Sequence, residues 1–429
     1  MVLAPGPRHR RIPDPELRGQ QHGAATLHEV LGVVDYVFMK IAVVIDAVYP
    51  YSKGGREKRL FELTTRLSAM GDEIHIYTMK WWEGANHVVE NGVHLHAVSR
   101  LYPQYSGRRR SIRQGVLFGL ACLRLIGESF DVIDVDHMPY FPVFAVWLVC
   151  KIRRQNMIAT WHEALALSDW LSYAGIIVGV LAALIERAAA HLPDAIVANS
   201  GQTRDLLATK LRRRGNVEMV PPGFDARIID EAVAAPRRVD VIFVGRLVKD
   251  KNLPLLIDAL RLLTCRGRCV TCRIVGSGPE ESNLQRAIEG ARLHASVELM
   301  PSLPDQDDVY AQMKAARVFA FPSKREGFGM VVLEALACGL PVVTIDAPAN
   351  ASRHLINDGG NGSVVQSTSA SFAAGVEQWL SACVERGSIA ASVGGYDWDI
   401  LAAQLREVYR RSARLADARA HSGNGEQPQ

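Results

Sequence analysis

Short runs rich in valine and isoleucine alternate with stretches of helical periodicity along this chain, and that alternation is the feature that most constrains its fold. Helical patterns fill most of the gaps between the runs, notably Arg56–Met70, Ser111–Ile126 and Ala174–Ala190. Alternating strands and helices build a parallel sheet that is covered by helices on both faces. In the first half of the chain the predicted strands are Lys40–Asp46, Glu73–Thr78, Val93–Val98, Asp131–Asp136, Met157–Trp161 and Ala195–Asn199.

The pattern is interrupted at "VPPGFD", Val220–Asp225, and a second series of strands follows. The sequence therefore predicts an α/β fold of two doubly wound Rossmann-like domains, joined near Pro221–Arg238. Because such sheets bind ligands at the carboxyl ends of their strands, we expect the domains to face each other across a cleft that holds the site. The predicted strands of the second series are Val241–Leu247, Thr271–Gly278, Ser296–Met300, Val318–Ser323 and Pro341–Asp346.

The two strand series set the expected domain bounds. We expect the N-terminal domain to span residues 39–225 and the C-terminal domain residues 239–395. A helix over residues 396–413 is expected to return to the N-terminal domain. Residues 1–38, which lack the apolar core of a secretory signal, are interpreted as a disordered leader or a mis-called start. Residues 414–429 are interpreted as a disordered tail.

The composition is that of an ordinary globular protein, with 48% hydrophobic residues, 22% charged residues and a net charge of +4. A charge this small does not indicate a nucleic-acid partner. The seven cysteines lie mostly in apolar stretches, which predicts reduced thiols in a cytoplasmic protein. Cys265, Cys269 and Cys272 have a spacing that resembles an iron–sulfur motif. However, Cys269 and Cys272 run into a predicted strand, where alternation sends their side chains to opposite faces.

Two motifs follow strands of the first series. Gly54 and Gly55 open a helix, where adjacent glycines let backbone N–H groups approach an anion at the positive end of the helix dipole. The alternative is that this pair forms only a tight turn. The pattern is not G-x-G-x-x-G, which counts against a dinucleotide-dependent dehydrogenase. His162 and Glu163 end a later strand, so His162 is either structural or faces the cleft.

Two cations follow the first strand of the second series, in "VGRLVKDKN". Arg246 and Lys251 are either solvated loop residues or a clamp on a diphosphate, for which arginine supplies a planar fork and lysine a point charge. Gly276 and Gly278, in "VGSGP", follow the next strand. We predict that these glycines serve backbone geometry first and ligand contact second.

The stretch "EGFGMVVLEALACG" places two carboxylates after a strand of the second series. Glu326 is predicted to project at the cleft, where the alternative is a helix-capping role. Glu334 lies about one turn into an apolar helix, where an unpaired carboxylate is costly to bury. It is either the partner of an arginine or the acceptor for a vicinal diol such as ribose, and the nearby cations favour the diol. Between the carboxylates lie Gly327, Phe328, Gly329, Met330 and Val331.

In their order along the chain, these motifs resemble those of a retaining glycosyltransferase of family 4, which has the GT-B fold. The resemblance spans Met39–Arg411, and "EGFGMVVLEALACGLPVV" is its most specific part. It implies transfer of a hexose from a UDP- or GDP-linked sugar to an acceptor hydroxyl with retention of anomeric configuration. The implied mechanism is front-face substitution, in which the departing phosphate helps to deprotonate the acceptor. The nucleotide sugar is a co-substrate, and neither a cofactor nor a catalytic metal is implied.

The resemblance also implies a role for each matching residue. Arg246 and Lys251 would bind the donor diphosphate, and Glu334 the nucleotide ribose. Glu326 would hold hydroxyls of the transferred sugar, and His162 would lie near its anomeric carbon. The implied catalytic residues are His162, Glu326, Arg246 and Lys251, and the implied donor-binding residues are Gly54, Gly55, Gly276, Gly278, Gly327, Phe328, Gly329, Met330, Val331 and Glu334.

Two positions depart from the family's pattern and leave the donor identity open. Glu163 follows His162 where aspartate is common, and Ser352-Arg353 occupy a loop that often carries an acidic residue. Two other functions stay open: a sugar-nucleotide epimerase of similar fold, and a non-catalytic transferase-like subunit. A glycosidase is disfavoured because a hydrolase has no use for a diphosphate clamp.

The acceptor is expected to be a sugar, a lipid-linked glycan or another cell-envelope glycan. Arg108–Ile126 and Phe141–Arg154 are apolar segments with basic ends. They either dock peripherally at the inner face of a membrane or form core helices, and the second interpretation is favoured. Trp170–Ile185 is the most apolar stretch, but it is shorter than the about 20 residues of a membrane span and is predicted to be a buried helix.

Overall fold

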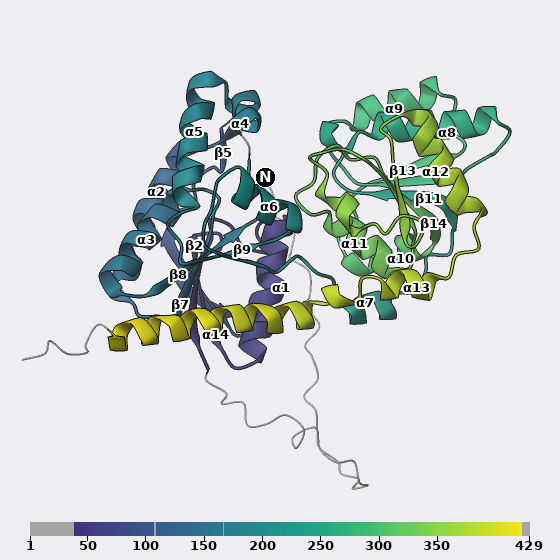
Figure 1. The fold of residues 1–429 in the computed structure, drawn as a ribbon. Helices are drawn as coiled ribbons and strands as arrows, with labels where there is room; N and C mark the ends of the chain where they lie inside the picture. Colours follow the sequence, from purple (N-terminus) through teal and green to yellow (C-terminus); the bar gives the residue numbers. More distant parts are fainter. Residues whose placement is uncertain (1–37, 107–108, 166, 423–429) are drawn as a thin grey trace, which may run out of the picture. The chain divides into compact units, whose positions relative to one another are not determined.

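The computed structural model describes residues 38–106, 109–165 and 167–422. From Met39 onward the described residues belong to one unit, whose two large sheets are mostly parallel in the first and entirely parallel in the second (Figure 1). The expected leader, apart from Phe38, lies outside the described residues, as does the end of the expected tail.

The first sheet has the strand order β10-β9-β8-β7-β1-β2-β4-β3. Every pairing in it is parallel except that of β3 with β4, which is antiparallel. This arrangement places the carboxyl ends of β1, β7 and β8 side by side at one edge. The strands are β1 (Lys40–Val44), β2 (Glu73–Met79), β3 (His87–Glu90), β4 (Val93–Ser99), β7 (Val132–Asp136), β8 (Asn156–Trp161), β9 (Ala195–Ala198) and β10 (Asn216–Met219).

Helices cover both faces of the first sheet, because the side chains of its strands divide between two hydrophobic cores. One core is shared with α2 (Ile112–Cys122), η1 (Leu123–Gly127), α3 (Phe141–Arg153), α4 (Leu167–Ala174), α5 (Ile176–Ala189) and α6 (Gly201–Thr209). The other core is shared with α1 (Gly55–Ala69) and α14 (Trp398–Ser422). A short hairpin, β5 (Tyr105–Ser106) with β6 (Arg109–Arg110), precedes α2.

The last helix packs on the first sheet although it follows the second sheet in sequence (Figure 1). Trp398 and Tyr409 of α14 are buried, and Tyr409 Oη donates to Asp134 Oδ2 of β7 at 2.6 Å. The helix continues to Ser422, beyond residue 413, where the sequence predicted its end. The expected disorder from residue 414 is therefore corrected for residues 414–422, a stretch rich in alanine, arginine and leucine, which favour helix.

The second sheet is entirely parallel, with the strand order β13-β12-β11-β14-β15-β16. Its strands are β11 (Val239–Val244), β12 (Cys272–Val275), β13 (Val297–Met300), β14 (Ala316–Phe321), β15 (Val342–Ile345) and β16 (Gly362–Val365). Its helical segments are α7 (Ala226–Glu231), η2 (Lys249–Lys251), α8 (Leu253–Cys265), α9 (Glu281–Gly290), α10 (Gln306–Lys314), α11 (Met330–Ala337), η3 (Ala351–Leu355), α12 (Ser369–Ser381), α13 (Arg386–Ala391) and η4 (Gly394–Tyr396).

The prediction that the apolar stretch Trp170–Ile185 forms a buried helix is wrong. Most of α5 is exposed, and Ile177 is 85% and Leu181 58% accessible to solvent. The reason is that α5 packs on α4, and its residues in the core of the first sheet lie at its carboxyl end, where Ala189 is buried. Among the described helices, none combines the length and the apolar character that a bilayer crossing requires.

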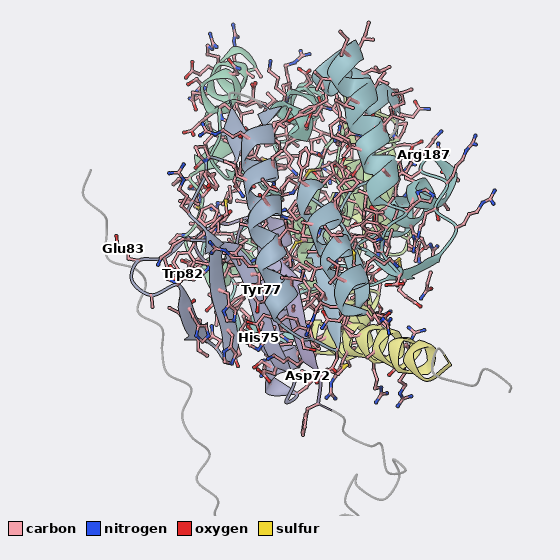
Figure 2. All side chains as sticks on the ribbon, turned by 90° about the vertical axis from the view of Figure 1, so that its left-hand side faces the viewer. Asp72, His75, Tyr77, Trp82, Glu83 and Arg187 are labelled. Atoms are coloured by element: carbon pink, nitrogen blue, oxygen red, sulfur yellow. The ribbon has the colours of Figure 1, made fainter. Side chains whose placement is uncertain are left out.

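Four histidines stack on one face of the edge strands β2, β4 and β3, where Figure 2 labels His75. His75 Nδ1 lies 2.9 Å from His96 Nε2, and His87 Nε2 lies 3.1 Å from His94 Nδ1. Glu73 Oε1 lies 2.7 Å from His75 Nε2, and Lys40 lies near this carboxylate. Burial lowers the pKa of His96 to about 4, and burial is also the main reason that the pKa of His75 is lowered.

This histidine stack is expected to make folding acid-sensitive. A folded-state pKa below the unfolded value of 6.5 means that the unfolded chain binds more protons as the pH falls from about 6.5 to about 4. The contribution of these neutral histidines to the free energy of unfolding is therefore complete above pH 6.5 and is lost as the pH falls from about 6.5 to about 4. In unfolding titrations, His96→Gln should show a shallower loss of unfolding free energy across this range than the unsubstituted protein. The exposed His294→Gln should match the unsubstituted protein, and equal slopes for His96→Gln would contradict the prediction.

Candidate functional site

Acidic and basic side chains meet at the carboxyl edge of the first sheet. Asp46 follows β1, Asp136 ends β7, and His162 follows β8, so the parallel strands bring the three together. Arg56, in the first turn of α1, joins them: its Nη2 donates to Asp46 Oδ1 at 2.6 Å and its Nη1 to Asp136 Oδ1 at 3.1 Å. These four residues are called the strand-end cluster below.

Within the strand-end cluster, Asp136 holds the imidazole of His162. The distance between His162 Nε2 and Asp136 Oδ2 is 2.8 Å, and the His162 side chain is 16% exposed. Burial opposes ionisation of Asp136, but Arg56 and His162 outweigh it and keep the pKa of that carboxyl well below its usual range. Asp136 is therefore a buried anion that orients His162 and leaves one edge of its ring facing outward.

Asp46 is fully buried and collects donors from several elements. Besides Arg56, it accepts from Arg110 Nη1 at 2.8 Å and from Gln114 Nε2 at 3.1 Å. A buried charge is tolerated only when it is paired and hydrogen-bonded in this way. Asp46 thus ties the β5–β6 hairpin and α2 to the strand-end cluster.

A second group of polar residues lies at the carboxyl edge of the second sheet. Lys251, in η2 after β11, donates to Glu326, and its ammonium lies 4.8 Å from the centre of the Phe321 ring. Ser323 Oγ donates to Glu326 Oε1 at 2.7 Å. Arg246 is exposed, and its guanidinium has no hydrogen-bonding or ionic partner among the described residues. The structure thus pairs Lys251 with Glu326 and leaves the Arg246 side chain open to an anion.

Backbone bonds fix the position of Glu326. Its N–H donates to Ala349 O at 2.9 Å, and its carbonyl accepts from Ala351 N at 3.0 Å. Gly329 has a φ of +95°, and a side chain there would collide with Ser352. Gly329 leads into α11 without a side-chain cap, and Val332 N already donates to Gly329 O at 2.9 Å. The N–H groups of Met330 and Val331 are therefore the ones available to an anion.

The glycines Gly276 and Gly278 are required by packing between two loops. Gly276 has a φ of +154°, and a Cβ on it would overlap the carbonyl oxygen of Gly245. A Cβ on Gly278 would overlap the carbonyl oxygen of Leu247. This close approach explains both glycines through backbone geometry, so a contact with the donor remains a prediction for them.

Glu334 is buried in α11 and accepts three hydrogen bonds at Oε1. The donors are Lys58 Nζ at 3.1 Å, Gln306 Nε2 at 3.3 Å and Tyr310 Oη at 3.3 Å. Burial disfavours the charge on Lys58, but the neighbouring Glu334 raises the pKa of this ammonium above its usual value. One of the two interpretations of the sequence paired Glu334 with an arginine. In the structure Glu334 is paired with a cation, but this cation is Lys58 of α1.

Residues of the two sheets also come together around the glycine turns. A Cβ on Gly55 would lie 3.1 Å from Met330 Sδ, and a Cβ on Gly327 would lie 3.3 Å from the His162 carbonyl oxygen. Arg325 forms an ion pair with Glu163. The predicted residues Gly55, His162, Gly327, Met330 and Glu334 thus lie at contacts between the two halves of the chain. Gly54 precedes Gly55 as the N-cap of α1, Phe328 is buried against Tyr396, and Val331 lies in the first turn of α11.

Sequence reasoning missed Asp46, Arg56, Lys58 and Asp136. Asp46 and Asp136 carry a readable signal, since each ends a valine-rich strand ("AVVID" and "DVIDVD") at the edge where ligands bind. Arg56 and Lys58 sit in "GGREKR", directly after the glycine pair, and nothing local distinguishes them from solvated helix residues. The described residues hold no group of three or more His, Cys, Asp or Glu side chains placed to bind a metal ion.

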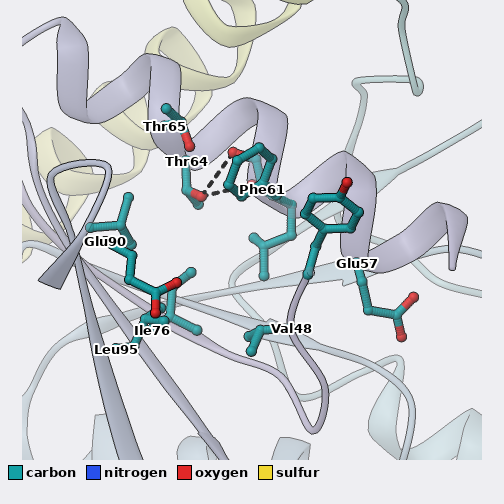
Figure 3. A pocket seen from close by; sticks show the side chains of 11 residues that line it. Val48, Glu57, Phe61, Thr64, Thr65, Ile76, Glu90 and Leu95 are labelled. Atoms are coloured by element: carbon teal, nitrogen blue, oxygen red, sulfur yellow. Dashed lines mark hydrogen bonds between the residues drawn. The ribbon is translucent and has the colours of Figure 1, made fainter. Parts of the chain in front are cut away.

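A separate pocket lies between α1 and the strands β2 and β4 (Figure 3). Val48, Phe61, Thr64 and other mostly apolar residues line it, and the charged groups of its described lining are Glu57 and Glu90. No cation stands among the described residues that line the pocket, and the carboxylate of Glu57 is already paired with Arg56, so this pocket is no candidate for a diphosphate site.

Comparison with known families and proteins matches both halves of the chain. Residues 53–227 match the family described as "Glycosyltransferase Family 4", and residues 225–387 match "Glycosyl transferases group 1". A D-inositol 3-phosphate glycosyltransferase from Kineococcus radiotolerans is 27% identical over 406 residues, which cover 84% of this chain and 91% of that protein. A phosphatidyl-myo-inositol mannosyltransferase from Mycobacterium leprae is 26% identical over 389 residues, which cover 86% and 97%, respectively.

Solved structures of similar fold also match nearly the whole chain. A sucrose-phosphate synthase from Thermosynechococcus elongatus superposes with a TM-score of 0.74 at 17% identity, covering 87% of this chain and 98% of that one. Anabaena Alr3699/HepE, solved in complex with UDP-glucose, gives a TM-score of 0.63 at 18% identity, covering 87% and 100%. The predicted GT-B fold of two parallel-sheet domains is confirmed.

Proposed function

Since the chain belongs to glycosyltransferase family 4, we propose that it transfers a hexose from a UDP- or GDP-linked sugar to an acceptor hydroxyl with retention of anomeric configuration. The observation that carries the proposal is the group of Arg246, Lys251 and Glu326 at the carboxyl edge of the second sheet. Two cations that follow one strand, beside an uncapped helix start, suit a diphosphate.

The proposed contacts with the donor follow from the charge of the side chains and from which of their polar groups lack a partner among the described residues. Arg246 offers a planar fork to the diphosphate, and Lys251 is held in place by Glu326 and adds a point charge. The free N–H groups at the start of α11 face the same anion. Neutralising the departing diphosphate is the electrostatic contribution that most lowers the barrier. Glu334 meets the ribose, for which it has to share its oxygens with Lys58.

The proposed reaction is a substitution on one face of the sugar. The bond between the anomeric carbon and the phosphate oxygen breaks, and its electron pair leaves with the diphosphate. The acceptor oxygen bonds to the anomeric carbon on the same face and gives its proton to the departing phosphate oxygen. His162, held by Asp136, lies against the sugar, and Glu326 binds its hydroxyls while its charge opposes the cation that develops at the anomeric carbon.

The proposed acceptor is a hydroxyl of a sugar or of a similar polyol, which a lipid carries. Two relatives act, by their names, on D-inositol 3-phosphate and phosphatidyl-myo-inositol, which are polyol phosphates, one of them lipid-linked. The strand-end cluster supports this class of acceptor, because carboxylates and guanidinium groups bind hydroxyls and phosphate.

Donor binding tests the proposal directly. A nucleotide sugar at about a hundred times its Kd should stabilise the folded chain by about 2.7 kcal/mol. Thermal unfolding with UDP-, GDP- and ADP-sugars should therefore show a rise in Tm with one nucleotide class. Arg246→Ala should weaken donor binding about ten- to a hundredfold, since a hydrogen bond to a charged group contributes about 1.5–3 kcal/mol. Arg261→Ala, which removes an exposed arginine from α8, is the matched control and should leave affinity unchanged.

Product analysis separates the proposed transfer from its rivals. Incubation with the sugar nucleotide and an acceptor should give a glycoside whose anomeric configuration, read by NMR, matches that of the donor. An isomerised sugar nucleotide formed without acceptor would replace the proposal with epimerisation. If no nucleotide sugar raises Tm, the chain has no donor site and the proposal fails.

A further inference from the structure

The helix α5 presents an apolar strip to solvent. Ile177, Leu181 and Leu184 are spaced by four and three residues, so they lie on one side of the helix, and all three are exposed. Ile176 and Val180 widen the strip. Single exposed apolar residues are common on the surface of a soluble protein. A contiguous apolar strip instead indicates a site at which another molecule binds.

The opposite side of α5 is fixed, so the strip cannot turn inward. Gly179 packs on the backbone of α4, and a Cβ there would lie 2.7 Å from Trp170 O. Glu186 Oε2 accepts from Trp170 Nε1 at 2.5 Å, and Glu186 Oε1 accepts from Leu165 N at 3.1 Å. The α4–α5 hairpin is therefore a rigid element whose buried face is already satisfied.

Four elements on this face of the first sheet, α2, η1, α3 and α5, carry exposed cations and no exposed acid within their bounds, whereas α4 and α6, which share the same core, carry Asp169 and Asp205. Among the described residues of α2, η1, α3 and α5, the carboxylate is that of Glu186, which is fully buried. Glu128, which directly follows η1, is an exposed acid. Arg187, labelled in Figure 2, lies near the end of the apolar strip. The other exposed cations of these elements are Arg113, Arg124, Lys151 and Arg153.

We propose that this face is a docking surface for an anionic lipid bilayer, on which α5 lies without crossing it. The docking face is defined by the strip Ile176, Ile177, Val180, Leu181 and Leu184 together with Arg113, Arg124, Lys151, Arg153 and Arg187. An apolar strip flanked by cations inserts among acyl chains while its charges meet lipid phosphates. A second copy of the chain is the poorer occupant, because a symmetric contact would press two cationic faces together.

The docking face is also connected to the candidate site. Tyr173 of α4 accepts a hydrogen bond from Arg110 N at 3.2 Å, and Arg110 Nη1 reaches Asp46 of the strand-end cluster at 2.8 Å. Docking would thus bring the first-sheet half of the site close to the lipid surface. The proposal goes beyond the proposed transfer and does not depend on it, because binding to lipid is measured without any donor.

Vesicle sedimentation tests the docking face. The chain should sediment with phosphatidylcholine vesicles that contain phosphatidylglycerol, and much less with phosphatidylcholine alone. Ile177→Ser/Leu181→Ser should lower the partition coefficient at least about tenfold, because two large apolar side chains no longer insert. Arg113→Gln/Lys151→Gln should lower it about fivefold for each charge removed, and only on the anionic vesicles.

The matched control is Val233→Ser/Ile400→Ser, which removes two equally exposed apolar residues outside the docking face and should leave binding unchanged. Far-ultraviolet circular dichroism confirms that each variant is folded. A chain that stays in the supernatant with both vesicles, or whose binding ignores the Ile177/Leu181 pair, would overturn the proposal. So would a dimer, seen by light scattering, that this pair of substitutions dissociates, because it would assign the face to a second copy.

Discussion

Replacing Glu326 by glutamine is expected to lower kcat by about a hundred- to a thousandfold while the chain remains folded. Glu326 carries the negative charge that holds Lys251, and in the proposed reaction it faces the sugar where positive charge develops. Glutamine keeps the shape and the hydrogen bond from Ser323, and the backbone bonds of residue 326 do not depend on its side chain. The loss should therefore appear in turnover and leave thermal unfolding nearly unchanged.

Initial rates of product formation at saturating donor measure this effect. The control is Glu377→Gln, because Glu377 pairs with Arg266 and Arg268 at the surface of the second half and should tolerate the same change. Equal turnover for Glu326→Gln and the unsubstituted protein would remove Glu326 from the reacting centre. A loss of folded protein would instead show a structural role, and Tm separates these two results.

Replacing Arg56 by methionine is expected to cost about 3–5 kcal/mol of folding free energy, because it breaks a buried ion pair. Arg56 is the cation that Asp46 and Asp136 share, and both carboxylates are buried. Without it, Arg110 is the cation left beside Asp46 among the described residues, and Asp136 keeps the imidazole of His162 and, at 3.9 Å, that of His137. The cost arises because the charge of a buried carboxylate is left uncompensated.

Urea unfolding at several pH values measures this prediction. The pKa of Asp136 is depressed in the folded state, so its stabilisation is complete well above the usual carboxyl range and is lost as the pH falls through it. The difference between the two proteins should therefore be largest near neutral pH and shrink in acid. Asp136→Asn added to Arg56→Met should recover part of the loss. Arg204→Met, at a surface pair with Asp205, should cost at most about 1 kcal/mol, and an equal cost for Arg56→Met would contradict the prediction.

Most of the fold could be predicted because its strands and helices correspond to local patterns of apolar residues in the sequence. Valine- and isoleucine-rich runs such as Lys40–Asp46 and Val241–Leu247 became central parallel strands, since a buried strand needs apolar residues on both faces. The strand β10 escaped because its four residues, "NVEM", include a single β-branched residue and none of them is buried. The strand β16 escaped because the sequence around it ("GGNGSVVQ") reads as a turn. The helix α5 was placed in a core because hydrophobicity measures what can be buried and does not reveal whether a partner covers it.

The candidate site was only half readable for a different reason. Residues at strand ends, such as His162 and Lys251, could be placed because parallel strands bring their carboxyl ends to one edge. The partners of these residues come from helices that are distant in sequence. Lys58 lies in α1 and meets Glu334 of α11, and Arg56 bridges β1 and β7. Such pairings depend on how the elements assemble, and no spacing along the chain records them.

The position of α14 has a consequence for how this protein is made. The ribosome releases the strands of the first sheet early, but α14, which covers part of one face, is translated after the whole second sheet. Until then Asp134 lacks the hydrogen bond from Tyr409, and the apolar groups that will surround Trp398 remain exposed to solvent. The second half can close on itself first, so the usual order in which the earlier domain matures first is reversed at this face. The nascent first half therefore stays partly uncovered until the residues that follow the second half have been made.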